Sequence, residues 1–526
     1  MEQRRERLLF RAALLALLSY LGVFAVLNLR YLPVFVDGDI YADMLLAREM
    51  WRQKTLFPDN WIFGNQYYVI ATPVLCALLY GLTGSMNLSM ALATTLMGLA
   101  LLGALAWMLR PVLPSRALRM LSLLLFTAAP LGTRLLLEPE GQLFFVLASY
   151  YACYLITFFF VLGDYARALE RPERPRPAAL LLALMLSFAC GMQSLRQTAV
   201  MVLPLLVWEG LGLLRRLRRR EALLPAERRG ALRRVVGCAA ANLLGLGLMR
   251  LLDIPARSIY RDVAAGSAGL PARLHALWTA WRGISGLDAM LYGEAPVFFA
   301  LCFFAQVLSI LGAAVRLLRQ RRIDGLGRLW LLSLLSLAGT ALAGLVTSVQ
   351  MREIYLFLWY VLAALSPAVL LQGRKTFLMP AALVLLCLGN CFFSYGSSLR
   401  WAAAQDSREQ QRFCREAQEA GIAYVYGDWS FLPGFLVWSD GALTGGFSEG
   451  EGFVVRGSIN LQDIYSEEDN ARALYLFNPW SKGFLPLYAE QCGFPVELFG
   501  EYGACAAYRA ERQIMAMEER TVDFEE

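Results

Sequence analysis

Charge is scarce in this 526-residue chain, and histidine is almost missing. Only 17% of the residues are charged, whereas 58% are hydrophobic and the mean hydropathy is +0.48. A soluble protein of this length needs a more polar surface, so the composition excludes a soluble globular chain. The single histidine, His275, argues against a histidine metal cluster and against a Ser-His-Asp relay.

The sequence also lacks a cysteine spacing typical of a metal site and a signal-peptide cleavage site. The ten cysteines show no zinc-ligand spacing, and most lie in apolar runs, where they behave as small hydrophobes. Cys414, Cys492 and Cys505 lie in the polar C-terminal part, where at most one pair can oxidise. The first apolar run, 8–29, ends without the small residues of a cleavage site, so we expect a retained membrane span.

What the chain has is a series of apolar runs that approach the roughly 20 residues needed to cross a bilayer. Arginines gather in the short loops between these runs, so the net charge of +7 reports membrane topology rather than nucleic-acid binding. The alternation of basic loops predicts eleven spans, with the N-terminus cytoplasmic and the C-terminus outside. The expected spans are 8–29, 86–109, 117–137, 141–163, 178–193, 197–214, 235–252, 295–315, 329–347, 354–371 and 376–395. The run 67–82 is short and broken by Pro73, so we expect an interfacial or re-entrant helix there.

The composition changes after Arg400, where Gly, Asp, Glu and aromatic residues become frequent. An amphipathic helix is expected at 405–420, and short β-like runs separated by turn residues lie at 422–426, 472–477 and 505–508. The sequence therefore predicts an all-α polytopic transmembrane domain over 1–395, with a first outer loop at 30–85. A small extracytoplasmic α/β domain follows over 396–526. The basic loops and the outer domain favour a bacterial plasma membrane.

Three carboxylates lie within seven residues just after the first span. Asp39 and Asp43 are four residues apart, so a helix over this stretch presents them on one face. We expect a helix along the outer membrane surface, with its acids turned toward a cavity. The alternative is that Asp37 or Asp39 only caps this helix, as Asp often does.

Further charged residues lie at the predicted outer ends of spans: Arg134, Glu138, Glu140, Arg196, Arg352 and Glu353. A charge at membrane depth costs roughly 2.5–3.5 kcal/mol, so it persists where it faces a cavity or a partner. A carboxylate can act as general base toward a hydroxyl, and an arginine can hold a phosphate by paired hydrogen bonds. The set suits a ligand with a phosphate and a hydroxyl to be activated; alternatively, these side chains snorkel to the interface or pair with one another.

The acidic stretch resembles that of the GT-C superfamily of membrane glycosyltransferases, and within it the protein O-mannosyltransferase and lipid A aminoarabinose transferase branch. The tetrad Ala47-Arg48-Glu49-Met50 is similar to the end of that branch's acidic helix. Counting back from the tetrad places Asp39 at the branch's catalytic aspartate. The usual second acid falls on Ile40, a departure for which Asp37 or Asp43 would compensate.

Two later motifs resemble the same branch. Glu138-Pro139-Glu140 is similar to its second acidic position, which is normally an Asp before Pro. The stretch 191–197 resembles its Gly-x-x-x-x-Thr-Lys-Gly motif, and Arg196 stands where the family's lysine contacts the lipid phosphate. The motifs cover 1–210; from there to 395 the likeness is one of topology only.

The resemblance implies a GT-C-like fold and transfer of a sugar, with inversion, from a polyprenyl-phosphate-linked donor. The acceptor would be a glycan, lipid or protein on the outer face, the other partners would be membrane lipids, and no nucleic acid is involved. Asp39, helped by Asp37 or Asp43, would act as the base, and Arg196, with Arg352, would hold the phosphate. A divalent cation, Mg²⁺ or Mn²⁺, is left open, with Asp37 and Asp39 as its ligands.

Two other classes compete with this interpretation. A transporter or flippase of lipid-linked or anionic substrates predicts acids near the bilayer midplane, inverted repeats and broken helices. Here the charges lie at predicted outer ends and the sequence shows no internal repeat, which disfavours that class. A structural or assembly protein with an outer docking domain would leave the acidic stretch unexplained.

Overall fold

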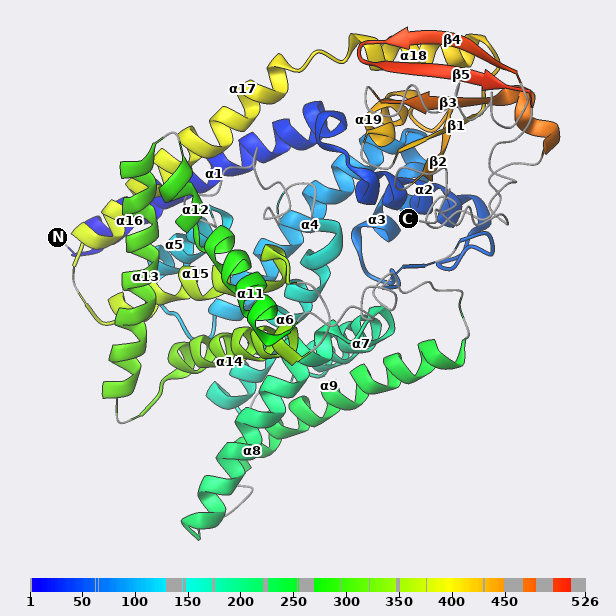
Figure 1. The fold of residues 1–526 in the computed structure, drawn as a ribbon. Helices are drawn as coiled ribbons and strands as arrows, with labels where there is room; N and C mark the ends of the chain where they lie inside the picture. Colours follow the sequence, from blue (N-terminus) through cyan, green and yellow to red (C-terminus); the bar gives the residue numbers. More distant parts are fainter. Residues whose placement is uncertain are drawn as a thin grey trace.

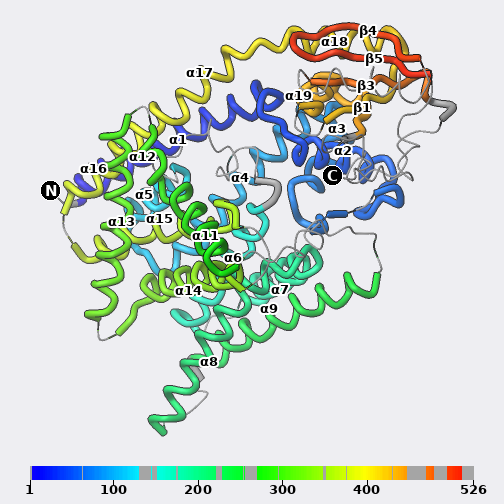
Figure 2. The backbone as a smooth tube through the Cα atoms, viewed as in Figure 1, coloured from blue at the N-terminus to red at the C-terminus, as the bar shows by residue number. Residues whose placement is uncertain are grey.

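The computed structural model describes residues 2–61, 63–64, 66–128, 144, 148–172, 176–220, 226–252, 254, 269–293, 295–320, 322–346, 351–374, 376–428, 431–448, 467–478 and 495–511. Within them a bundle of helices is followed by a small mixed sheet (Figure 1). The backbone tube shows the sheet lying at one end of the bundle, next to the segments near residue 50 (Figure 2).

Nine apolar helices within the described residues are long enough to cross a bilayer. They are formed by α1 (Glu2–Phe35), α4 (Met86–Leu109), α6 (Ala148–Glu170), η2 with α8 (Thr198–Val202, Leu203–Arg218), α9 (Ala226–Leu251), α13 (Pro296–Arg319), α14 (Gly325–Val346), η3 with α15 (Glu353–Leu356, Leu358–Leu371), and α16, η4 and α17 (Leu378–Asn390, Cys391–Tyr395, Gly396–Ala404). The predicted multi-pass helical class is therefore confirmed.

Two of the eleven predicted spans coincide with shorter helices. Span 117–137 begins as α5 (Arg116–Thr127), and span 178–193 is α7 (Pro177–Gln193). The count of eleven is therefore not confirmed, although a described helix overlaps each predicted span. The Pro73 segment forms α3 (Thr72–Thr83), whose 12 residues measure about 18 Å. That length is short of the roughly 30 Å hydrocarbon core, as expected for a helix that does not cross.

The C-terminal part contains a five-stranded sheet with the order β2-β1-β3-β5-β4. The strands are β1 (Tyr424–Asp428), β2 (Thr444–Ser448), β3 (Ala473–Phe477), β4 (Val496–Tyr502) and β5 (Cys505–Ala510), with the helices α18 (Arg408–Glu419) and α19 (Leu432–Leu436). Pairing is parallel among β2, β1 and β3 and antiparallel from β3 to β5 to β4. Val425, Leu474 and Leu476 are buried in the sheet, and Phe413 of α18 packs edge-on against the rings of Phe435 and Tyr502. The small α/β domain predicted from the sequence is thus present.

Segments predicted to lie on one side of the membrane meet in the structure. At one end, Ser115 before α5 donates to Glu6 of α1 at 2.8 Å, which joins two predicted cytoplasmic segments. At the other end, Arg48 of the first outer loop donates to the carbonyl of Gly441 in the C-terminal domain at 3.0 Å. Each of these two hydrogen bonds joins segments that the sequence places on the same side of the membrane.

Topology is tested by cysteine labelling at two exposed positions. Arg218→Cys, at the end of α8, is expected to react with a membrane-impermeant maleimide only from the cytoplasmic side, and Glu419→Cys, at the end of α18, only from the outside. The native cysteines in the described part of the chain are buried, so the unsubstituted protein serves as the low-labelling control. Labelling of both variants from the same side of intact cells would contradict the predicted orientation.

Candidate functional site

The acidic stretch forms helix α2 (Gly38–Gln53), and Asp37 caps its N-terminus. The Asp37 side chain accepts a hydrogen bond from the backbone N–H of Ile40 at 2.9 Å, and Asp37 itself is exposed. A carboxylate there also complements the positive end of the helix dipole. Asp37 is therefore the N-cap of α2.

Helix α2 is covered on two sides by other parts of the chain. On one side it packs against α3, where a Cβ added at Gly81 would fall 2.2 Å from the Trp51 ring. On the other side it meets the C-terminal domain: the Tyr41 hydroxyl donates to the carbonyl of Leu443, and Arg48 donates to the loop before β2. The single sequence contains no signal for this second contact, because it joins residues about 400 positions apart.

Asp39 and Asp43 share one neighbour, the phenol of Tyr68. Asp43 is buried and hydrogen-bonded to Tyr68, whereas Asp39 is half-buried. Burial, and with it the negative charges of Asp43 and Asp39, raises the pKa of Tyr68 well above its ordinary value. The two acids predicted to share a helix face therefore do converge, on a tyrosine that the sequence analysis did not single out.

A chain of hydrogen bonds leads from this acidic pair to the turn after α7. Gln66 Nε2 donates to the Tyr68 hydroxyl at 3.4 Å, and the Tyr154 hydroxyl donates to Gln66 Oε1 at 3.3 Å. Tyr154 is also 2.7 Å from the Ser194 hydroxyl. Together with the Tyr68–Asp43 bond, these contacts connect α2 through α6 to the residue two before Arg196.

Gln193 holds the segment that carries Tyr68. Its side-chain oxygen accepts from the backbone N–H groups of Val69 at 2.9 Å and Ile70 at 2.7 Å, and its carbonyl accepts from Tyr67 N–H at 3.0 Å. A buried amide with these partners fixes the spacing between the first outer loop and the end of α7.

Arg196 lies over three aromatic rings. Its guanidinium carbon is 4.7 Å from the ring centre of Tyr151, 5.4 Å from that of Tyr154 and 5.3 Å from that of Tyr355. These distances are typical of cation–π contacts. No carboxylate of the described residues forms an ion pair with Arg196, so its charge is held by ring faces and stays available to an anion.

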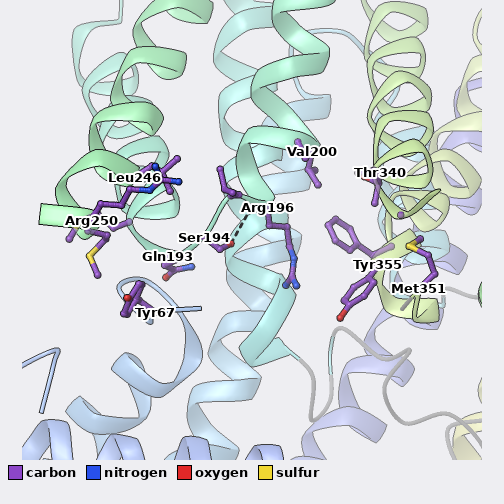
Figure 3. Close-up of a pocket in the computed structure, with 17 residues that line it drawn as sticks. Tyr67, Gln193, Ser194, Arg196, Val200, Leu246, Arg250, Thr340, Met351 and Tyr355 are labelled. Carbon is purple, nitrogen blue, oxygen red and sulfur yellow. Dashed lines mark hydrogen bonds between the residues drawn. The ribbon is translucent and has the colours of Figure 1, made fainter. Parts of the chain in front are cut away.

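Arg196 lines a cavity of about 620 Å³ between α7, α9, α14 and η3 (Figure 3). The lining residues are Tyr67, Met192, Gln193, Ser194, Leu195, Arg196, Ala199, Val200, Leu246, Met249, Arg250, Thr340, Ala343, Gly344, Met351, Tyr355 and Phe357. Most of this lining is apolar, and its two charged residues are the arginines at 196 and 250. A volume in this range suits a small-molecule ligand. The lining favours a ligand that has an anionic group and an apolar part.

The other predicted site residues are placed differently. Arg352 precedes η3 and is exposed; it is not among the described residues that line the cavity, although Tyr355 three residues later is. The Glu353 carboxylate packs against Gly283 of α11 (Leu270–Ser285), where an added Cβ would fall 1.8 Å from its Oε1. Three further site predictions lie outside the described residues: Arg134, Glu138 and Glu140.

The described residues contain no group of three or more His, Cys, Asp or Glu that could hold a metal ion. Asp37, one of the two predicted ligands, uses its side chain to cap α2. A divalent cation at Asp37 and Asp39 stays a prediction from the family resemblance.

The chain is thus a multi-pass helical membrane protein with a small α/β domain. No family model and no curated protein sequence matches it. The solved structures similar to it include two of ArnT from Cupriavidus metallidurans. The one bound to undecaprenyl phosphate is 14% identical, with a TM-score of 0.43, over 95% of this chain and 97% of that chain. The apo state is 14% identical, with a TM-score of 0.39, over 97% and 98%. ArnT, a lipid A aminoarabinose transferase, belongs to the branch whose motifs the sequence resembles.

Proposed function

We propose that the chain is a membrane glycosyltransferase that moves a sugar from a polyprenyl-phosphate-linked donor to an acceptor on the outer face of the plasma membrane. The observation that carries the proposal is Arg196 at an apolar cavity, with hydrogen bonds that lead from its backbone N–H through Ser194, Tyr154, Gln66 and Tyr68 to Asp43 of α2. The guanidinium suits a phosphate, the apolar lining suits an isoprenoid chain, and the acids suit a hydroxyl acceptor.

Asp39 is the general base in this proposal. Asp37 caps α2 and Asp43 is buried against Tyr68, whereas Asp39 is half-buried beside the same phenol. The acceptor oxygen attacks the anomeric carbon as its proton passes to Asp39, and the bond from that carbon to the phosphate oxygen breaks. A single displacement inverts the anomeric centre.

Arg196 stabilises the leaving phosphate in the same step. Negative charge develops on the phosphate oxygen as the sugar departs, and a cation already fixed over Tyr151, Tyr154 and Tyr355 needs little reorganisation to meet it. Arg250 adds a second positive charge at the exposed side of the cavity.

The proposal is tested with purified protein in liposomes that contain polyprenyl-phosphate-linked sugars labelled in the sugar. We expect label to appear on an added acceptor, with stoichiometric release of polyprenyl phosphate. Transbilayer movement of the intact lipid-linked sugar, without cleavage of its glycosidic bond, would instead establish the flippase alternative. The empty liposome is the control for spontaneous movement and hydrolysis.

A further inference from the structure

We infer that a second cavity, at the opposite end of the bundle from Arg196, is a binding site for an anionic phospholipid of the cytoplasmic leaflet. The cavity measures about 510 Å³ and lies between the start of α1, the start of α5 and the turn from α15 to α16. Figure 1 shows the N-terminus of α1 beside α16, away from the C-terminal domain. The inference is independent of the proposed transferase activity.

Two arginines line this cavity, Arg5 and Arg374, and neither forms an ion pair with a described residue. Glu6 also lines it, but its carboxylate accepts from the Ser115 hydroxyl at 2.8 Å. The remaining wall is largely apolar and includes Leu118 and Phe377. Paired cations above an apolar wall match a phosphate headgroup above an acyl chain.

The alternation of basic loops places both arginines at the cytoplasmic end of the bundle, where nearby helix termini also act on them. Arg5 lies near the N-terminus of α1, where the helix dipole disfavours a cation. Arg374 lies in the turn between the end of α15 and the start of α16, and at the end of α15 Arg316 donates to the carbonyls of Leu370 at 2.7 Å and Gln372 at 2.8 Å. A bound anion would offset the unfavourable position of Arg5, and the first turn of α16 lacks a side-chain cap.

The cavity lies where the apolar and charged surfaces of the bundle meet. Next to Arg5, Leu8 is 57% exposed, and after Arg374 and Thr376, Leu378 is 82% exposed. Such side chains face the hydrocarbon in a membrane protein, while the arginines beside them lie at headgroup level. A ligand that enters here comes from the membrane, which favours a phospholipid over a soluble phosphate.

The test is native mass spectrometry of the delipidated full chain, titrated with phosphatidylglycerol and, as the neutral reference, phosphatidylcholine. We expect the wild type to prefer phosphatidylglycerol, and Arg5→Gln/Arg374→Gln to weaken its binding about 30-fold, which is roughly fivefold for each of the two cations. The matched control is Arg218→Gln/Arg219→Gln, two exposed arginines at the end of α8, which should leave the affinity unchanged. Thermal unfolding of both double variants checks that each is folded.

A second variant fills the cavity without changing its charge. Thr376 lines it and is exposed, so Thr376→Trp should fold normally yet lower phosphatidylglycerol binding by steric competition. Equal binding of the two lipids, an equal loss in the control pair, or unchanged binding in Thr376→Trp would each overturn the proposal. Displacement of the lipid by millimolar inorganic phosphate would do so as well, because the site would then be one for a soluble anion.

Discussion

Replacing Asp39 by Asn is expected to lower sugar transfer by roughly 10²–10⁴-fold, the usual contribution of general acid–base catalysis. Asn keeps the shape of the side chain and an oxygen for hydrogen bonding, but it cannot accept the acceptor's proton at neutral pH. Asp39 is half-buried in the first turn of α2, so the substitution buries no new unpaired charge and the fold should persist. The measurement is the initial rate of label transfer at saturating donor, together with the thermal unfolding midpoint.

The other two acids of the stretch are the matched controls. Asp37→Asn should retain most activity, because Asn caps a helix about as well as Asp and can still accept from Ile40 N–H. Asp43→Asn should lose less than Asp39→Asn, because the amide oxygen can still accept from Tyr68. Loss of activity in Asp43→Asn together with near-normal activity in Asp39→Asn would identify Asp43, one helical turn further along α2, as the base. Near-normal rates in all three would remove the catalytic role of α2.

The helices were predictable because a bilayer imposes a length and a charge pattern that a single sequence displays. For example, the apolar run between Ser85 and Arg110 forms α4 (Met86–Leu109), with the ends predicted from the sequence. The sheet was predictable only in part. The runs that became β1, β3 and β5 are rich in β-branched, aromatic or small buried residues, whereas β2 (Thr-Gly-Gly-Phe-Ser) has the composition of a turn and forms a strand through its parallel pairing with β1.

The residues of the candidate site that belong to a family motif were predictable from the sequence. The residues that reach the site only through tertiary contacts were not. Arg196 followed from a motif and lies at the cavity. Its three tyrosine neighbours come from α6 and η3, and Tyr355 is 159 positions along the chain from it. The link from Tyr68 through Gln66 to Tyr154 likewise depends on how helices pack. Aromatic residues one turn apart in α6 were the available signal, but in an apolar helix the same pattern is typical of ordinary core packing.

Replacing Arg196 by Ala is expected to weaken binding of polyprenyl phosphate by about 10–150-fold. Hydrogen bonds to a charged group are worth roughly 1.5–3 kcal/mol, and each 1.4 kcal/mol is tenfold in affinity. Arg196→Lys should recover only part of the loss, because lysine keeps the charge but neither the planar two-point contact with phosphate nor the stacking on Tyr151, Tyr154 and Tyr355. The measurement is the dissociation constant of polyprenyl phosphate, by titration of the purified protein in detergent.

Two further arginines make this prediction specific to the cavity. Arg250→Ala removes the other lining cation and should have a smaller effect, because Arg250 is exposed and its charge is screened by water. Arg352→Ala tests the phosphate contact expected from the sequence; an unchanged affinity would agree with its position outside the cavity lining. The opposite result, with wild-type affinity in Arg196→Ala and weaker binding in Arg352→Ala, would place the phosphate near η3. The hydrogen bonds that connect Ser194 to Asp43 would then not lead to the phosphate site.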